Sequence, residues 1–240
     1  MPNEASFNTH TSNLQSQHYA IIVAGGSGTR MQSAVPKQFL LVNGLPVLMH
    51  TLNAFYTCQP QPTLILVLHP DYHSYWIRLC ADHQFQLPYT LVSGGDSRYQ
   101  SVKNALNLVP DNALVAVHDA VRPLISTDII EEAYNQAAVQ GAVVVAVKSR
   151  DSIRQVKDER SQSLLRDEIY LVQTPQTFKA GLLKAAYQHP YHEGFTDDAS
   201  VAEQAGHQIH IVEGSYQNFK ITFPEDIAIA ELLLNKKASL

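Results

Sequence analysis

The chain has 240 residues, with 17 Lys and Arg against 22 Asp and Glu, so its formal net charge is −5 at pH 7 with histidine neutral. This length suits one large domain or two small ones, and an apolar fraction of 45% is typical of globular proteins. The acidic balance argues against a nucleic-acid partner, which would demand many cations, and no apolar run is long enough to cross a bilayer, so no membrane partner is expected.

Residues 1–18 are rich in Asn, Ser, Thr and Gln and lack the basic start and apolar middle of a secretory signal. We therefore predict a disordered N-terminal tail over 1–18 and a single domain over 19–237. The two cysteines, Cys58 and Cys80, form no CxxC motif and no disulfide framework. This cysteine usage favours a cytoplasmic location.

From Tyr19 onward, short unbroken apolar runs alternate with longer amphipathic segments. Such runs are typical of strands buried on both faces of a parallel sheet. The pattern predicts an α/β fold with a Rossmann-like, open, mostly parallel twisted sheet and helices on both faces, whose ligands bind at the carboxyl ends of the strands. The predicted strands are 20–24, 63–68, 89–92, 113–117 and 142–147, and the predicted helices between them are 47–56, 71–84, 97–109 and 127–140.

The segment 148–172 breaks this alternation because it is highly charged. Two strand-like stretches, 152–156 and 168–172, flank its polar middle and predict an arm that projects from the sheet. The same pattern is equally consistent with a solvated hairpin that has no role. Beyond the arm, helices are predicted over 179–188, 196–205 and 224–236.

A glycine-rich loop directly follows the first predicted strand. Glycines let the backbone approach an anion and turn its N–H groups inward, although such a loop could also serve only to reverse the chain. It matches neither a Walker loop nor a dinucleotide fingerprint, but Arg30 and then Lys37 place two cations just beyond the glycines. The candidate phosphate-binding residues are Ala24, Gly25, Gly26, Ser27, Gly28, Thr29, Arg30 and Lys37.

A second glycine motif, Gly94, Gly95 and Asp96, precedes the predicted helix that contains Ser101. It could bring the backbone close to a ligand, although Asp96 could equally be the N-cap of that helix. At the end of the fourth predicted strand, Asp119 and Arg122 could hold hydroxyls and a phosphate or neutralise each other.

Some polar residues of these motifs have simpler structural interpretations. His118 is expected to be packed rather than catalytic, since phosphoryl transfer with a good leaving group needs little proton transfer. Thr196 is expected to cap the helix that follows it. Lys220 lies in a strand-like stretch, where a lone lysine most often points to solvent.

Taken together, these motifs resemble the 2-C-methyl-D-erythritol 4-phosphate cytidylyltransferases of the non-mevalonate isoprenoid pathway. The resemblance runs from about Tyr19 to Leu234 and includes the glycine-rich loop, Pro36-Lys37-Gln38, Gly94 to Ser101, His118 to Pro123, Thr174-Pro175-Gln176, Thr196-Asp197 and Lys220. It implies transfer of CMP from CTP to methylerythritol phosphate with release of pyrophosphate.

The resemblance also implies the role of each residue. Residues 24–30 would bind the CTP phosphates, with Arg30 and Lys37 stabilising the transition state. Gly94, Gly95, Asp96 and Ser101 would bind cytosine, and Asp119 would lie near the ribose and the substrate. The substrate-binding residues would be Asp119, Arg122, Ser152, Arg166, Thr196 and Lys220, with Arg166 and Lys220 also counted as catalytic.

Arg166 would act across a homodimer interface formed by the arm at 148–172. Ser152 departs from the family, which often has Asp-Thr where this chain has Asp151-Ser152. The resemblance implies Mg²⁺, bound mainly through CTP phosphates rather than by a cage of protein ligands.

Three alternatives remain open at the level of sequence. The nearest is a cytidylyltransferase acting on ribitol 5-phosphate, since it would share the nucleotide half of the site. A second is a nicotinamide-dependent oxidoreductase on a Rossmann fold, which the imperfect fingerprint disfavours. A third is an inactive nucleotide-binding module, against which Arg30, Lys37 and Lys220 argue.

Overall fold

The structure, a computed structural model, describes residues 17–25 and 35–238 of the chain. Its main sheet has seven strands in the order β11-β7-β10-β6-β1-β4-β5, and all of them are parallel except β10. This arrangement confirms the predicted fold class. The strands are β1 (His18–Ala24), β4 (Thr63–Leu68), β5 (Thr90–Ser93), β6 (Leu114–Asp119), β7 (Ala142–Lys148), β10 (Tyr170–Lys179) and β11 (His210–Glu213).

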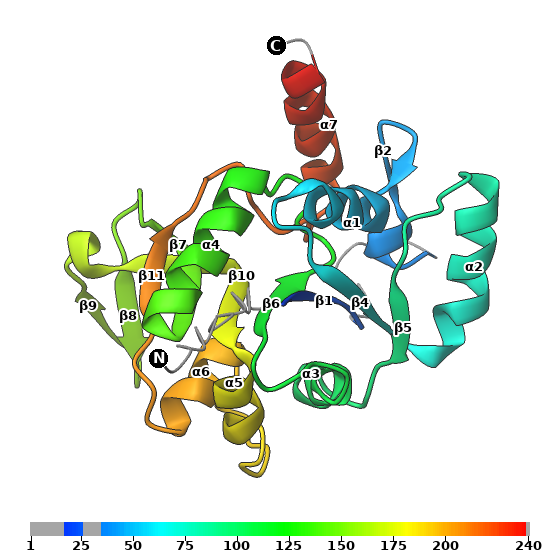
Figure 1. The fold of residues 1–240 in the computed structure, drawn as a ribbon. Coiled ribbons are helices and arrows are strands. Elements are labelled where there is room, and N and C mark those ends of the chain that lie inside the picture. The colour runs from blue at the N-terminus through cyan, green and yellow to red at the C-terminus, as the bar shows by residue number, and fades with distance from the viewer. Residues whose placement is uncertain (1–16, 26–34, 239–240) are drawn as a thin grey trace, which may run out of the picture.

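Helices cover both faces of this sheet, as Figure 1 shows with α1 and α4 on one side and α3, α5 and α6 on the other. The helix α7 extends away from the sheet toward the C-terminus. None of the helices in the described part of the chain combines the length and apolarity needed to cross a membrane. The helices are α1 (Val47–Thr57), α2 (His73–Asp82), α3 (Arg98–Leu106), α4 (Thr127–Gln140), α5 (Ala180–Ala186), α6 (Asp198–Gln204) and α7 (Glu225–Ala238).

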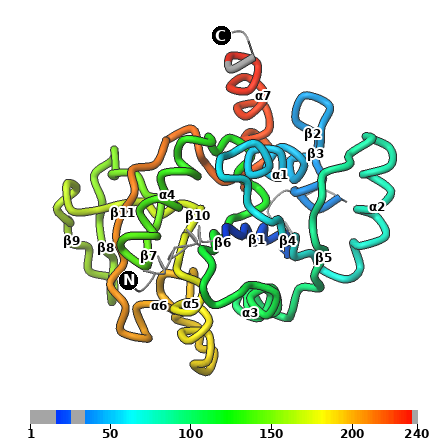
Figure 2. Tube along the Cα trace, in the orientation of Figure 1, coloured from blue at the N-terminus to red at the C-terminus, as the bar shows by residue number. Residues whose placement is uncertain are grey.

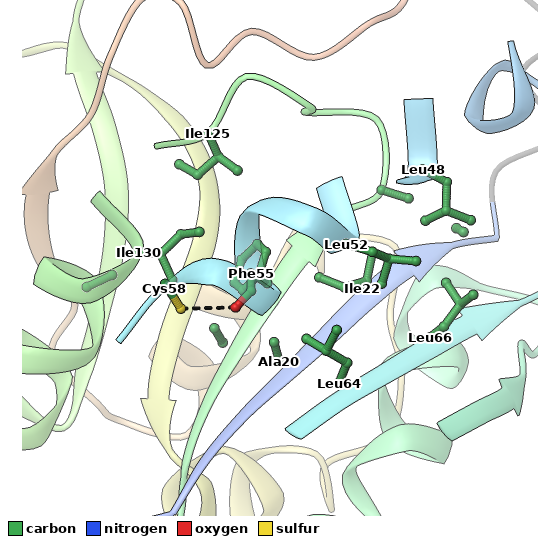
Figure 3. Packing of buried hydrophobic residues seen from close by; sticks show 14 of the residues in the cluster. Ala20, Ile22, Leu48, Leu52, Phe55, Cys58, Leu64, Leu66, Ile125 and Ile130 are labelled. Carbon is green, nitrogen blue, oxygen red and sulfur yellow. Dashed lines mark hydrogen bonds between the residues drawn. The ribbon is translucent and has the colours of Figure 1, made fainter. Parts of the chain in front are cut away.

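The core has two layers because successive side chains of a strand point to opposite faces. In β1, Ile22 packs with α1 and α4 residues, whereas its neighbour Ile21 packs with residues of α3 and α5. Figure 3 shows the first layer, where Leu52 and Phe55 of α1 lie over the strands. Burial on both faces explains why the strands read as unbroken apolar runs.

Most of the central strand β10 was not predicted as a strand. It lies antiparallel between β6 and β7, and its register shifts between Val172 and Gln176, around the cis peptide bond Thr174-Pro175. An internal proline and several polar residues are unusual in a central strand, so residues 173–179 carry no strand pattern, and only 170–172 fall within a predicted strand-like stretch. The prediction that 168–172 is the second strand of the arm is therefore wrong, because most of it belongs to β10 or to the 3-10 helix Arg166–Glu168.

The hairpin of the arm is shorter than predicted and is formed by β8 (Arg154–Lys157) and β9 (Arg160–Ser163). Figure 2 shows it at the side of the molecule, beyond β7 and β11. All eight of its strand residues are exposed. The prediction of a projecting hairpin within 148–172 is thus confirmed, although its boundaries are not.

Other element boundaries also differ from the predicted ones. The predicted tail lies outside the described residues except for 17 and 18, and His18 already belongs to β1. Residues 218–222 form no strand, contrary to the strand-like interpretation of the stretch around Lys220. The remaining elements are β2 (Leu41–Val42), β3 (Leu45–Pro46) and the 3-10 helices Lys37–Phe39 and Pro70–Tyr72.

Candidate active site

Three of the predicted motifs meet at the carboxyl edge of the parallel strands. β1 ends at Ala24 and β6 at Asp119, and the two strands are neighbours in the sheet, with Val23 opposite Asp119. The N–H of Gly94 donates to the carbonyl of Leu68, the last residue of β4, over 2.9 Å. The sheet topology therefore assembles the loops after β1, β5 and β6 into one place, as expected for an open α/β sheet.

Ser101 is the point at which the two glycine segments meet. Its Oγ accepts a hydrogen bond from the N–H of Gly95 (3.0 Å) and donates to the carbonyl of Ser97 (2.9 Å). A Cβ at Gly94 would lie only 3.2 Å from this Oγ, and one at Gly25 would lie 3.6 Å away. A side chain at position 94 would therefore press on Ser101, and glycine allows the close approach of the backbone to α3 without such a displacement.

The N-cap of α3 is Ser97, whose Oγ accepts from the N–H of Gln100 over 3.0 Å. The alternative in which Asp96 caps this helix is therefore wrong. Asp96 lies one residue before the cap, in the loop that follows β5, and ligand binding by Asp96 stays a prediction.

Asp119 pairs with two cations at the end of β6. Its Oδ2 lies 3.1 Å from Nε of Arg122 and 3.2 Å from Nζ of Lys220. Burial alone would raise the pKa of this carboxyl, but Lys220, Arg98 and Arg122 together hold the pKa below its usual range. The single carboxylate of Asp119 thus holds Arg122 and Lys220 side by side at the end of β6.

Residues 218–222 run along the edge of the site and carry Lys220 to Asp119. The N–H of Ile221 donates to the carbonyl of Val121 (2.9 Å). From the other side, Nζ of the buried Lys37 donates to the carbonyl of Ile221 (2.8 Å). Lys37 and Lys220, distant in sequence, are thereby held on the same short segment.

Gln38 ties the neighbouring motif to the end of β1. Its side-chain Nε2 donates to the carbonyl of Ala24 over 2.9 Å, and the side chain is buried. The predicted triplet Pro36-Lys37-Gln38 therefore anchors both the start of the glycine-rich loop and the segment that carries Lys220.

His118 is fully buried and has hydrogen-bond partners on both ring nitrogens, as expected for a packed histidine. Its Nε2 lies 3.3 Å from the carbonyl of Arg122, which can only accept, so this nitrogen carries the proton. Its Nδ1 accepts from the hydroxyl of Thr174 (3.0 Å), and the Oγ1 of that hydroxyl accepts from the N–H of Asp119 (3.0 Å). Burial lowers the pKa of His118 to about 3, so the ring is neutral and braces the backbone of Asp119.

The sequence analysis missed Arg98, which also reaches the site. Its Nη2 lies 2.6 Å from Oδ2 of Asp198, a completely buried carboxylate at the start of α6. Burial alone would lower the pKa of the guanidinium, but Asp198 and Asp119 raise it above its usual range. Arg98 lies within the glycine motif that the sequence analysis singled out, and its charge was the available signal.

The start of α6 places Thr196 beside these cations. The N-cap of α6 is Asp197, which forms a reciprocal capping box with Ser200, so the prediction that Thr196 caps this helix is wrong. Thr196 instead precedes the cap. Gln176 of β10 holds the cap in place, since its Nε2 donates to Oδ2 of Asp197 over 2.9 Å.

These side chains line one cavity of about 230 Å³. A larger cavity, of about 530 Å³, lies beside β7 and β11 and is lined by none of the predicted site residues. The smaller cavity is lined by Arg98, Asp119, Arg122, Val172, Gln173, Thr174, Gln176, Thr196, Asp197 and Lys220.

Other predicted residues are not brought to this cavity. Ser152 and Arg166 are exposed in the arm, and Arg166 pairs over 3.7 Å with its neighbour Asp167. Gly26, Ser27, Gly28, Thr29 and Arg30 lie outside the described residues.

Two carboxylates line the cavity, those of Asp119 and Asp197, and Asp197 is engaged as the N-cap of α6. Within residues 17–25 and 35–238, no cluster of three or more His, Cys, Asp or Glu side chains could hold a metal. Asp119 offers one carboxylate at the cavity, and Mg²⁺ typically takes one or two carboxylates together with phosphates and waters.

Comparisons with known proteins agree with this geometry. A family model described as IspD, 2-C-methyl-D-erythritol 4-phosphate cytidylyltransferase, matches residues 18–236. The curated protein of that name from Porphyromonas gingivalis is 44% identical over 222 residues, which are 92% of this chain and 99% of the relative. The one from Bacteroides thetaiotaomicron is 45% identical over 214 residues, which are 89% and 98% of the two chains.

Solved structures give the same result. The crystal structure of 4-diphosphocytidyl-2C-methyl-D-erythritol synthase from Anaerococcus prevotii superposes with a TM-score of 0.78 at 29% identity and covers 92% of this chain and 96% of its own. The 2-C-methyl-D-erythritol 4-phosphate cytidylyltransferase of Francisella tularensis reaches 0.74 at 32% identity, with 90% and 99% covered.

Proposed function

The chain belongs to the 2-C-methyl-D-erythritol 4-phosphate cytidylyltransferase family, and we propose that the cavity around Asp119 is where it carries out that family's reaction. The enzyme transfers CMP from CTP to 2-C-methyl-D-erythritol 4-phosphate, giving 4-diphosphocytidyl-2-C-methyl-D-erythritol and pyrophosphate in isoprenoid biosynthesis. The observation that carries the assignment of the site is the convergence of Arg98, Arg122 and Lys220 on one cavity at the carboxyl edge of the sheet.

The main obstacle to this reaction is electrostatic, because both reactants are anions. A phosphate oxygen of the substrate attacks the α-phosphorus of CTP in line, the bond to the β-phosphate oxygen breaks, and pyrophosphate leaves. Cations that are already fixed in place stabilise the charge that develops in the transition state without reorganising. Lys37 and Lys220 meet this requirement, since the carbonyl of Ile221 holds the first and Asp119 holds the second.

On the nucleotide side, Ala24 to Arg30 bind the triphosphate in this proposal, and Arg30 and Lys37 stabilise the transition state. Gly94, Gly95, Asp96 and Ser101 bind cytosine. The position of Ser101 supports this assignment, because its Oγ accepts from the N–H of Gly95 and lies close to Gly25, at the start of the phosphate-binding loop.

On the substrate side, Thr196 and Lys220 bind the phosphate of methylerythritol phosphate, while Asp119 and Arg122 lie beside its hydroxyls and the ribose. All four side chains line the same cavity. When bound to the triphosphate, Mg²⁺ neutralises phosphate charge, and we assign Asp119 as the protein carboxylate that faces it.

A pyrophosphate-release assay tests the proposed function. The wild-type enzyme with Mg²⁺ and methylerythritol phosphate should release pyrophosphate from CTP faster than from ATP, GTP or UTP, and ribitol 5-phosphate should be the poorer acceptor. Replacing Lys37 or Arg30 by Ala should lower turnover about 100- to 1000-fold. Near-wild-type turnover in both variants would contradict the assignment. A preference for ribitol 5-phosphate would instead identify the enzyme as a ribitol 5-phosphate cytidylyltransferase.

We further propose a homodimer in which Ser152 and Arg166 of the arm complete the cavity of the partner subunit. Support comes from their exposure in this chain and from exposed apolar side chains of the same region. Leu165 is 70% exposed and Val156 is 69% exposed.

Mixing two inactive variants tests the shared site. If Arg166 acts in the partner's cavity, a heterodimer of one R166A subunit and one K220Q subunit has one intact site of its two. Because random mixing makes about half of the dimers heterodimers, it should restore about a quarter of the wild-type activity. The matched control is a mixture of K37A and K220Q, whose residues belong to one subunit's site and should restore nothing. No recovery in the first mixture would contradict the exchange of arms.

The proposed place of action is the cytoplasm. The support is compositional, since the two cysteines form no disulfide: Cys58 is buried and Cys80 is half-buried, and both are free thiols. A fractionation experiment that finds the protein in the cytoplasmic extract would agree, and its recovery from another compartment would contradict the proposal.

A further inference from the structure

The family resemblance assigned no role to Arg98, yet its side chain reaches the substrate cavity. Arg98 is the first residue of α3, directly after the loop that carries Gly94 and Gly95. It lines the cavity together with Lys220 and Thr196, and its side chain is 30% exposed. The backbone of Arg98 thus follows the proposed nucleotide-binding loop, while its guanidinium lies on the side of the cavity proposed to bind the substrate.

Asp198 holds this guanidinium but cannot itself reach a ligand. The residue is completely buried, and it does not line the cavity. Both of its carboxylate oxygens have partners: Oδ2 accepts from Nη2 of Arg98 and Oδ1 accepts from the hydroxyl of Tyr187, each over 2.6 Å. Of the two side chains that bond to Asp198, Arg98 is the one that lines the cavity.

The frame that carries Asp198 is fixed independently of Arg98. Gln176 uses both ends of its amide on α6, since its Oε1 accepts from the N–H of Ala199 and its Nε2 donates to Oδ2 of Asp197, each over 2.9 Å. The capping box between Asp197 and Ser200 closes the same turn. The carboxylate of Asp198 is thus preorganised to receive the guanidinium.

We propose that Asp198 is a positioning residue, which holds the guanidinium of Arg98 so that Arg98 binds the phosphate of the sugar-alcohol substrate alongside Lys220. This inference rests on the proposed function of the cavity. It adds Arg98 to the phosphate-binding residues and assigns to the Arg98–Asp198 pair a role in substrate affinity.

The chemistry of the pair favours this role over a purely structural link. A buried ion pair contributes little net stability, because the cost of desolvating two charges offsets their attraction. A guanidinium has five N–H donors in a planar fork that matches phosphate, and the bond to Asp198 uses one of them. A guanidinium that is already fixed at the cavity also loses little conformational entropy when a phosphate binds.

The test is a double-mutant cycle read as kinetic constants and as direct binding. Asp198→Asn keeps the size of the side chain and removes its charge, and Arg98→Gln removes the guanidinium. D198N should raise the KM for methylerythritol phosphate about tenfold, with the KM for CTP changed less than about twofold, because a charge-assisted phosphate contact is weakened. In the R98Q background, D198N should have no further effect on that KM, since the residue through which it acts is gone.

A calorimetric titration with methylerythritol phosphate separates this inference from the proposed function. Weaker binding to D198N than to the wild type supports the inference even if the wild type releases no pyrophosphate. Should D198N fold poorly, Tyr187→Phe removes one hydrogen bond from Asp198 and should raise the same KM about threefold. The inference is overturned if D198N binds and turns over like the wild type, or if it weakens binding equally in the Arg98 and R98Q backgrounds.

Discussion

Acidification from neutral pH should destabilise the protein through His118. The pKa of this buried imidazole falls from 6.5 to about 3 because burial disfavours its charged form. Between these two values the unfolded chain binds one more proton than the folded protein does, so the free energy of unfolding decreases as the pH falls. From about pH 7.5 to about pH 4.5, the loss attributable to His118 is about 2.7 kcal/mol, at about 1.4 kcal/mol per pH unit below 6.5.

Urea unfolding at several pH values measures this loss. His118→Gln removes the titrating ring while leaving an amide that can donate toward the carbonyl of Arg122. The variant should be less stable than the wild type at neutral pH, but its further loss on acidification should be smaller by about 2.7 kcal/mol. His18, whose pKa burial also lowers, contributes a loss of the same sign to both proteins.

The matched control is His189→Gln, because this exposed residue bonds through its backbone carbonyl rather than its ring. The control should lose the same stability as the wild type on acidification. If H118Q also loses as much as the wild type, His118 does not stay neutral in the folded protein and the account of its burial is refuted.

Three substitutions test other parts of the structure. Ser101→Ala removes the acceptor for the N–H of Gly95 and should raise the KM for CTP about three- to tenfold in initial-rate assays, with little change in kcat. Lys220→Gln should lower turnover about 100-fold and raise the KM for methylerythritol phosphate, as measured by pyrophosphate release. Thr51→Val leaves the carbonyl of Ala120 without its 2.8 Å hydrogen bond and should cost about 1–3 kcal/mol in urea unfolding, with kcat unchanged at 25 °C.

Each substitution has a control or an outcome that would contradict it. Thr57→Val lies on the same helix at an exposed position and should cost far less stability than T51V. Lys179→Gln removes an exposed lysine outside the cavity and should keep wild-type turnover. An unchanged KM for CTP in S101A, or unchanged kinetics in K220Q, would remove these residues from the proposed site.

Local pattern predicted β1, β4, β5, β6 and β7, because strands buried in a parallel sheet read as apolar runs, but it missed the parallel edge strand β11. It failed for β10, whose Gln173, Thr174 and Gln176 are buried polar residues in a central position. Two of these polar side chains form hydrogen bonds that hold the cavity together. Thr174 accepts from the N–H of Asp119, and Gln176 donates to the carboxylate of Asp197 at the start of α6. Departures from the usual apolar pattern of a buried strand are expected at functional sites, and the part of β10 that departs from it lines the cavity.

The sequence named some of the residues that line the cavity and missed others. Asp119, Arg122, Thr196 and Lys220, which the resemblance assigned to the substrate, line one cavity, and substrate binding by them stays a prediction. Arg98 was missed because its partner Asp198 is 100 residues away in sequence, and no local pattern reveals such a pair. Thr196 was assigned the cap that Asp197 provides, because neighbouring polar residues offer equivalent capping oxygens.

Identification of the products tests the central claim most directly. The purified enzyme is incubated with CTP, methylerythritol phosphate and Mg²⁺, and the mixture is analysed by phosphorus NMR and mass spectrometry. The account predicts pyrophosphate and 4-diphosphocytidyl-2-C-methyl-D-erythritol in equal amounts, with the new diphosphate joining CMP to the phosphate of the sugar alcohol. Recovery of unchanged substrates, or of pyrophosphate with free CMP, would contradict it.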